Sequence, residues 1–359
     1  MSEGYLLSRV LLTFQTESDD LVEELSAVAI TPEGSLWVGS DEFVSLERLT
    51  PMGHNVYGGH TTFYLKDFVD LPGCDSEIDV EGLDYSDGYL WVVGSHSSKR
   101  SSTKGKKAKK DIQRLAEVEA ESNRYLLARL PILNGAIVPT YARSEAEQDT
   151  LTAAVLAPSG AQNQLMEVLR EDEHLGPFLR INLPSKDNGL DIEGLAVHDH
   201  HIFLGLRGPV LRGWAIILDI ELESPEPGLL ALKDLGDGLR YRKHFVDLNG
   251  LGVRELCLHG EDLIILAGPT MELEGAMQVF RLKDVLKHSQ DTLWDQDSGR
   301  LEQLFDLPFT LGSDHAEGLA LVPCLGYSDG LMVVYDSPNP NRRPEPNAIF
   351  ADVFRLPLR

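Results

Sequence analysis

The chain contains the stretch Asp191-Ile192-Glu193-Gly194-Leu195-Ala196, and shorter forms of it recur at four other places. The fullest second copy is His315-Ala316-Glu317-Gly318-Leu319-Ala320, and the other three are centred on Glu24, Glu81 and Glu255. Each copy is followed by a turn and by a second apolar run that ends in a small residue. Such runs, broken by turn residues, are typical of β-strands. The stretch therefore marks the start of a repeated pair of strands.

The copies recur at intervals of roughly 60 residues, one of them doubled, and each interval has room for four short strands. A unit of this size that repeats around a ring is typical of a β-propeller, in which each blade buries its faces against its neighbours. We expect an all-β fold, a β-propeller of five blades. The doubled interval between Glu81 and Glu193 leaves six blades open as the alternative.

The last unit is one strand short, because the chain ends soon after the apolar run from Ile349 to Leu356. The strand-like segment Leu6 to Phe14 has no partner in the first unit. The two ends are therefore expected to pair and close the ring, which makes residues 1–359 a single domain. Two insertions are expected in blade two: a basic loop plus a helix (Asp111 to Ser122) over residues 97–122, and a helical segment over residues 145–175.

The charge limits the classes of partner. The formal net charge is −25, and a strongly acidic protein repels phosphate backbones. Nucleic acid binding is therefore not expected, except through the segment Lys99 to Lys110, which contains seven basic residues and no acidic residue. No apolar run is long enough to span a membrane, and the N-terminal residues lack the basic region of a signal peptide. We expect a cytoplasmic protein without a membrane partner.

Propeller geometry predicts which residues share one mouth of the ring. The inner strands begin, and the second strands end, at the same mouth. Five carboxylates facing one channel repel one another unless cations or hydrogen bonds intervene. The residues expected at this mouth are Glu24, Asp41, Glu42, Glu81, His96, Glu193, Arg207, Arg254, Glu255, His315, Glu317 and Asp336, together with the lysine-rich loop that begins at Lys99.

Three interpretations of this mouth remain open. The carboxylates of Glu24, Asp41, Glu81, Glu193, Glu255, Glu317 and Asp336 could bind a hard cation such as Ca²⁺, which prefers oxygen ligands. Glu193, Glu317, His96 and His315 could act in acid–base catalysis, while Arg207, Arg212, Arg254 and Lys99 hold an anionic group. Alternatively, the repeated glutamates could bind backbone amides of the neighbouring blade and serve only as structural latches. The histidines at 198, 200 and 201 fall in a turn on the opposite face, where surface roles are expected.

Three longer phrases resemble a bacterial family of proteins of unknown function over nearly the whole chain. They are Gly205-Leu-Arg-Gly-Pro-Val-Leu-Arg-Gly-Trp-Ala215, Gly252-Val-Arg-Glu-Leu256 with Ile265-Leu-Ala-Gly-Pro-Thr270, and His315-Ala-Glu-Gly-Leu-Ala320 with Val333-Val-Tyr-Asp-Ser-Pro338. More distantly, Glu-Gly-Leu-Ala and Gly39-Ser40-Asp41-Glu42 are similar to phytase-like and esterase-like propellers. That resemblance implies that Asp41, Glu42, Glu193 and Glu317 match acidic positions near the channel mouth, and that the reaction is a calcium-assisted phosphoester hydrolysis. The missing signal peptide departs from those largely exported proteins.

Two functions follow as hypotheses. The first is a propeller that binds, and as a metal-dependent hydrolase cleaves, an anionic, phosphorylated small molecule at the mouth. The second is a non-catalytic platform that uses the mouth and the lysine-rich loop to bind a protein partner.

Overall fold

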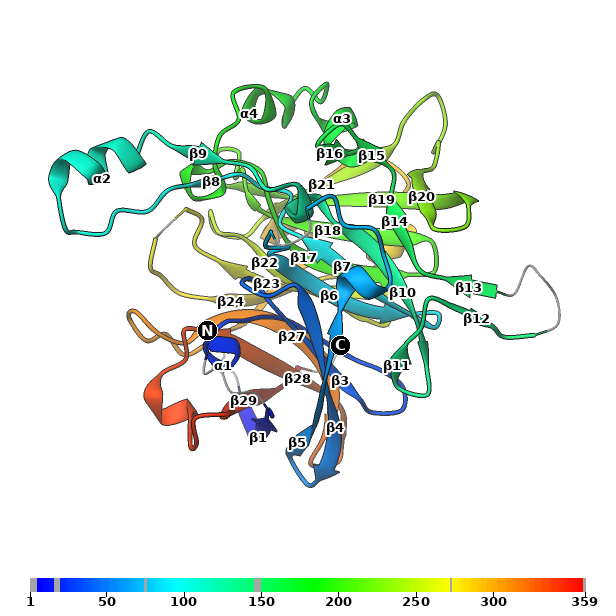
Figure 1. Ribbon diagram of the computed structural model, residues 1–359, viewed down its shortest axis with the longest axis vertical. Helices are drawn as coiled ribbons and strands as arrows, with labels where there is room; N and C mark the ends of the chain where they lie inside the picture. The colour runs from blue at the N-terminus through cyan, green and yellow to red at the C-terminus, as the bar shows by residue number, and fades with distance from the viewer. Residues whose placement is uncertain (1–4, 16–19, 74–75, 145–149, 272, 358–359) are drawn as a thin grey trace.

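The structure is a computed structural model that describes residues 5–15, 20–73, 76–144, 150–271 and 273–357. It consists mainly of β-strands (Figure 1), and the contacts between the strands arrange them around a common centre. This arrangement confirms the all-β propeller fold that the repeats predicted.

Five strands open the five sequence repeats and form the inner ring. Along the ring, β2 contacts β6, β6 contacts β17, β17 contacts β22, β22 contacts β27, and β27 returns to β2. In particular, β6 lies directly against β17, although more than a hundred residues separate the two strands in sequence. The inner strands are β2 (Leu25–Ile30), β6 (Val80–Ser86), β17 (Asp191–His198), β22 (Gly252–His259) and β27 (His315–Cys324).

Three further strands continue each unit outward through antiparallel pairing. The first unit adds β3 (Leu36–Ser40), β4 (Ser45–Gly53) and β5 (Val56–Tyr64). The second adds β7 (Tyr89–Gly94), β10 (Leu127–Leu133) and β14 (Ala154–Leu156). The third adds β18 (His201–Gly208), β19 (Trp214–Glu226) and β21 (Tyr241–Asp247). The fourth adds β23 (Asp262–Gly268), β24 (Gln278–Leu282) and β26 (Leu301–Asp306). The fifth adds β28 (Tyr327–Asp336), β29 (Ala348–Arg355) and β1 (Tyr5–Thr13).

The N-terminal strand completes the last unit, as expected. Strand β1 pairs antiparallel with β29, from Tyr5 opposite Arg355 to Thr13 opposite Ala348. It also pairs in parallel with β5 of the first unit, through Leu11 and Leu12. The two ends of the chain therefore hold the ring closed by strand pairing.

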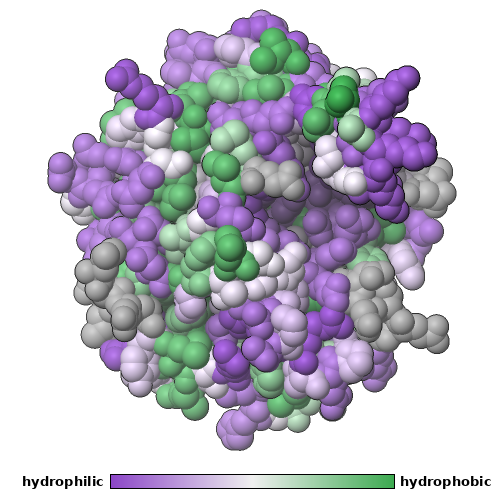
Figure 2. Space-filling view, turned by 90° about the vertical axis from the view of Figure 1, so that its left-hand side faces the viewer, coloured by the Kyte–Doolittle hydropathy of each residue, from purple (hydrophilic) through white to green (hydrophobic). Residues whose placement is uncertain are grey.

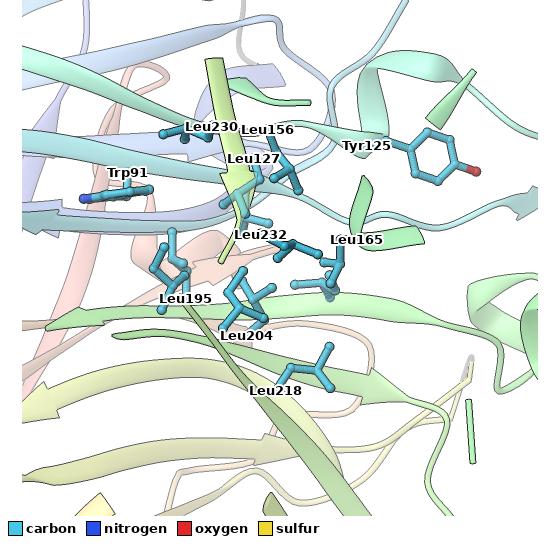
Figure 3. Close-up of a cluster of buried hydrophobic side chains, with 14 of the residues drawn as sticks. Trp91, Tyr125, Leu127, Leu156, Leu165, Leu195, Leu204, Leu218, Leu230 and Leu232 are labelled. Carbon is cyan, nitrogen blue, oxygen red and sulfur yellow. The ribbon is translucent and has the colours of Figure 1, made fainter. Parts of the chain in front are cut away.

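The core lies between neighbouring units. Five clusters of buried apolar side chains fill the five contacts between units around the ring. Figure 3 shows the cluster between the second and third units, where Trp91 and Leu127 face Leu195, Leu204 and Leu218. Burying such side chains stabilises the fold by about 1.5–3 kcal/mol each. Because each unit supplies apolar residues to both neighbours, packing positions the inner strands relative to one another.

The expected insertions differ from the structure in their helices. Residues 108–114 form α2 (Ala108–Arg114), but residues 118–119 form a short strand, so the helix from Asp111 to Ser122 was wrong in its extent. In the second insertion, residues 145–149 lie outside the described part, and strands cover residues 150–152 and 154–156. Within the described part of this insertion the helix is α3 (Gln164–Leu169), and α4 (Gly176–Arg180) follows directly after it. Each of these helices is too short for its periodicity to fix its ends.

The remaining elements are short. The helix α1 is Asp20–Glu23, and the 3-10 turns are Leu65–Asp67, Ser122–Tyr125, Ser185–Asp187, Val285–Lys287, Gln296–Ser298 and Pro340–Arg342. The short strands are β8 (Lys99–Arg100), β9 (Val118–Glu119), β11 (Ala136–Ile137), β12 (Thr140–Ala142), β13 (Thr150–Thr152), β15 (Pro158–Ser159), β16 (Gln162–Asn163), β20 (Leu229–Leu232) and β25 (Thr292–Trp294). Among the described residues, no helix has the length and apolar character that a membrane span needs.

Candidate functional site

A bulge near the start of each inner strand builds one mouth of the ring. The ladder skips one residue in β2, β6, β17 and β22, and two residues in β27. A bulge leaves its extra residue without a ladder partner and re-aims its side chain. The residues displaced in this way are Ser26, Glu81, Glu193, Arg254 and Glu317 with Gly318. We call the end of the ring where they lie the mouth.

This register corrects the alignment of the repeats. The sequence placed Glu24 and Glu255 at the same position as Glu193. In the structure, Ser26 takes that position in the first unit and Arg254 takes it in the fourth. The offset is two residues in the first unit and one in the fourth. The mouth therefore does not carry a ring of five equivalent glutamates.

A chain of ion pairs crosses the mouth from the third unit to the fifth. Glu193 is 2% exposed, and its Oε1 lies 2.7 Å from Nη1 of Arg207. Its Oε2 lies 3.0 Å from Nε of Arg254, and Arg254 Nη2 in turn contacts Oε1 of Glu317. The Arg207 Nη1 also lies 3.7 Å from Oδ2 of Asp191. Both arginines are therefore engaged by carboxylates of the protein.

A second group of charges lies where the second unit meets the mouth. Arg124 places Nη1 2.7 Å from Oδ2 of Asp79 and contacts Glu77 through Nη2. Lys99 lies at the edge of this group, with its Nζ 2.8 Å from Glu77 and 3.3 Å from Glu121. Burial raises the pKa of Asp79 to about 6, although Arg124 opposes the shift. The basic groups here are again paired with acids.

Asp41, directly after β3, has several carboxylates around it. Burial, together with the charges of Glu317, Asp79, Asp336 and Glu24, raises its pKa to about 9. Its Oδ1 is buried without a hydrogen-bond partner. A buried carboxylate in this setting either takes up a proton or requires a cation.

Two of the glutamates that the bulges displace also have raised pKa values. Burial raises the pKa of Glu317 to about 7, with Asp336 and Glu193 adding to the shift and Arg254 opposing it. Burial also raises the pKa of Glu81 well above its usual range, and the charges of Asp79 and Glu193 add to that effect. The protein thus supplies fewer positive charges than the mouth has carboxylates.

A cavity of about 860 Å³ opens beside Asp41. Acidic side chains and a proline-bearing loop line it, including Glu23, Glu24, Asp41, Asp336, Pro338, Arg343 and Glu345. His315 lies near this wall, with Nδ1 3.6 Å from Asp336 and Nε2 3.4 Å from Glu274. The hydrogen bond to Asp336 raises the pKa of His315. Figure 2 faces this side of the molecule and shows a hollow with hydrophilic walls.

Three of the expected site residues, His96, Arg212 and Glu255, take no part in the ion pairs of the mouth. His96 is 1% exposed, and its ring nitrogens face Gly94 O at 2.8 Å and the Asn163 side chain at 2.7 Å. Burial lowers its pKa to about 4, so the ring is a neutral packing group. Arg212 is exposed in the turn between β18 and β19 and makes no ion pair within the described part of the chain.

Glu255 has the geometry of a latch. Its Oε1 accepts hydrogen bonds from the backbone amides of Leu195 at 2.9 Å and of Leu256 at 2.8 Å. Leu195 belongs to the neighbouring inner strand, whose channel-side amides have no further strand to pair with. Asp84 makes a similar contact with the amide of Val197 at 2.7 Å. Glu255 therefore joins two units and does not point into the mouth.

Sequence reasoning missed three charged residues of the mouth. Asp79 and Asp191 each stand two residues before a bulge glutamate, so the pattern Asp-x-Glu in two repeats was a usable signal. Arg124 comes from a 3-10 turn that ends the basic insertion. Nothing in the repeat pattern marks it.

The histidines on the opposite face form a second group of possible metal ligands. The ligand atoms of His200, His201 and Glu221 lie within 4.8 Å of one another. However, Lys233 lies 2.7 Å from Oε2 of Glu221, and Arg242 lies 3.3 Å from its Oε1. These cations already neutralise the carboxylate, so the group is explained as a surface network.

Several solved structures resemble the whole chain at a low level. A streptogramin B lyase is 9% identical, with 99% of this chain and 100% of that chain covered and a TM-score of 0.38. A PQQ-bound aldose sugar dehydrogenase from Streptomyces coelicolor is 10% identical, with 98% and 99% covered and a TM-score of 0.37. The calcium-binding protein regucalcin from Agrobacterium tumefaciens is 10% identical, with 98% and 94% covered and a TM-score of 0.37. Similarity at this level does not indicate a shared activity.

No protein with a curated description matches the sequence. One family model does match, and it covers residues 24–352, which include all five inner strands and the mouth. The chain therefore belongs to the family described as "Protein of unknown function (DUF3616)".

Proposed function

We propose that the mouth binds a hard divalent cation such as Ca²⁺ and, through it, an anionic small molecule. The observation that supports this most is the setting of Asp41. The charges that act on it most strongly are all carboxylates, and its Oδ1 has no hydrogen-bond partner. A cation held by oxygen ligands removes the mutual repulsion of such a group. Asp41, Glu24 and Asp336, which line the cavity together, are the candidate ligands.

The arginines support a cation more than they support direct anion binding. Arg207 and Arg254 are each engaged by two groups of the mouth, so an anion would have to displace protein carboxylates from them. A bound cation would instead attract an anion without breaking these pairs. The cavity beside Asp41 gives such a ligand room, since small-molecule sites typically measure about 300–1,000 Å³.

Hydrolysis of a phosphoester is the reaction we propose for this arrangement. A divalent cation would polarise the phosphoryl oxygen and lower the pKa of bound water. Glu317 has a pKa raised to about 7, which suits a group that accepts a proton near neutral pH. Glu193, held by two arginines, would position those arginines and would not accept the proton.

We infer that the ring has five blades. The direct contact between β6 and β17, and the five apolar clusters between successive units, support this number over six. We also infer that the latch interpretation applies to Glu255 and not to Glu193 or Glu317, whose partners are arginine side chains.

A thermal-melt series tests the cation site. Chelator-treated protein is titrated with Ca²⁺, Mg²⁺ and Mn²⁺, alone and with phosphorylated metabolites. A cation that binds only the folded state must raise Tm by mass action. Asp41→Asn is expected to abolish the cation-dependent rise. Asp199→Asn, which removes an exposed carboxylate in the turn on the opposite face, serves as the matched control and should leave the rise unchanged.

The outcome also separates the two parts of the proposal. A rise with Ca²⁺ but no phosphatase activity on simple phosphoesters would leave a binding protein. A flat response to every cation, or a rise that survives Asp41→Asn, would overturn the site.

A further inference from the structure

A basic arm projects from the mouth side of the molecule. It comprises residues 99–119: β8 and β9 pair at its base, and α2 forms its tip. Figure 1 shows α2 beyond the body on the side where α1 also lies. None of the α2 residues is buried. The arm is therefore an extension that the propeller does not need for its own packing.

The charge of the arm is divided between its base and its tip. At the base, Lys99 is paired with Glu77, and Arg100 is paired with Asp187 at 2.6 Å. Five further lysines carry no ion pair within the described part of the chain: Lys104, Lys106, Lys107, Lys109 and Lys110. The tip thus presents uncompensated positive charge on a protein whose net charge is −25.

The tip also exposes apolar side chains. Ile112 is 70% exposed and Leu115 is 51% exposed, and both belong to the same short helix or its end. Isolated apolar residues on a surface are normal, but here they stand beside a cluster of lysines on a projecting segment. A complementary surface would be acidic with an apolar edge.

The mouth has both of these properties. Its cavity is lined by acidic side chains, and Gly312 of the loop before β27 is part of that lining. The adjacent Leu311 is 75% exposed and the nearby Phe309 is 48% exposed. Gly312 donates a hydrogen bond to Glu274 at 3.3 Å, which brings Leu273, 60% exposed, to the same edge. The arm starts at the mouth, where Lys99 pairs with Glu77. Figure 1 shows α2 on the same side as α1, whose Glu23 lines the cavity.

We propose that two copies of this chain associate mouth to mouth, and that the arm of each copy binds the acidic cavity and apolar edge of the other. The lysines of the tip would face the cavity carboxylates, while Ile112 and Leu115 would pack on Leu311 and Phe309. Because each copy offers both surfaces on one side, a twofold arrangement satisfies both arms and closes at two copies. This inference does not rest on the proposed cation site. Because the arm would bind the same cavity carboxylates, a cation would compete with it, and the dimer is therefore tested in chelator.

Analytical ultracentrifugation of the full chain, in chelator, tests the dimer. We expect a monomer–dimer equilibrium at about 50 mM NaCl that weakens at about 500 mM, because exposed charges are screened within a few ångströms at high salt. The triple variant Lys106→Glu, Lys107→Glu and Lys110→Glu should raise the dimer Kd more than about tenfold. Leu311→Ser should raise it as well, at either salt concentration.

A matched control reverses Lys66, Lys283 and Lys287, which lie outside the arm, and changes the net charge by the same amount. It should weaken the dimer far less than the arm variant does. A wild-type chain that stays monomeric at low salt up to about 100 μM would overturn the proposal. Equal weakening by the arm and control variants would overturn it too, since it would reduce the effect to overall charge.

Discussion

Arg254 of the fourth unit binds Glu317 of the fifth, and the same guanidinium lies 3.0 Å from Glu193 of the third. One side chain thus connects three successive units across the mouth. All three residues are largely buried. Glu317 relies on this cation for compensation, whereas Glu193 is also paired with Arg207.

Replacing Arg254 is therefore expected to destabilise the protein. Arg254→Met leaves the buried Glu317 without its cation and leaves Glu193 with Arg207 alone. Removing one member of a buried pair lowers the free energy of unfolding by about 3 kcal/mol or more. Urea denaturation at neutral pH measures the loss. The double variant Arg254→Met with Glu317→Gln should recover part of it. No recovery would show that Arg254 acts through packing alone.

Glu255 offers a test of the latch. Burial raises its pKa well above the usual range, while the hydrogen bonds from the amides of Leu256 and Leu195 oppose that shift. Glu255→Gln retains an acceptor for the amides of Leu195 and Leu256, and should change the free energy of unfolding by no more than about 0.5 kcal/mol. Glu255→Ala leaves both amides without an acceptor and creates a cavity, and should lower the free energy of unfolding by about 3 kcal/mol. Equal losses in the two variants would contradict the latch.

The repeats made the fold predictable, because the turns and apolar runs recur in each unit. The pairing of Leu6–Phe14 with the C-terminal strand followed from a missing strand. The mouth was less predictable. A bulge shifts the register by one residue, and one residue decides which way a side chain points. For that reason Glu24 and Glu255 were expected at the bulge positions that Ser26 and Arg254 occupy.

Other parts of the site had no local signal. Arg124 reaches the mouth from an insertion, so its role depends on tertiary packing and not on the repeat. His96 follows an apolar strand in the position expected for the mouth, yet its ring turns toward Asn163 and Tyr125. The alternation of residues along a strand does not determine the backbone direction after the strand ends, so it does not predict where the His96 side chain points.

His96 should therefore matter for stability and not for ligand binding. His96→Ala removes the hydrogen bonds to Gly94 and Asn163 from a buried site and should lower the free energy of unfolding by about 2 kcal/mol. Any cation-dependent rise in Tm should keep its size relative to the variant's own baseline. A loss of that rise in a variant that still folds would return His96 to the site.

The mouth also predicts an unusual pH dependence. The pKa of Asp41 is raised to about 9 and that of Glu317 to about 7, so the folded state binds these protons more tightly than the unfolded chain does. Their contribution to stability is thus fully present below the unfolded pKa values, near 4, and is lost as pH rises toward 7 and then 9. In chelator, the free energy of unfolding should fall between pH 5 and pH 9, with a slope of up to about 1.4 kcal/mol per pH unit for each proton.

Asp41→Asn, which cannot ionise, should flatten the slope between pH 7 and pH 9, whereas Asp199→Asn should not. Stability that is flat or rises over this interval in the wild-type chain would show that the carboxylates of the mouth are compensated within the protein itself.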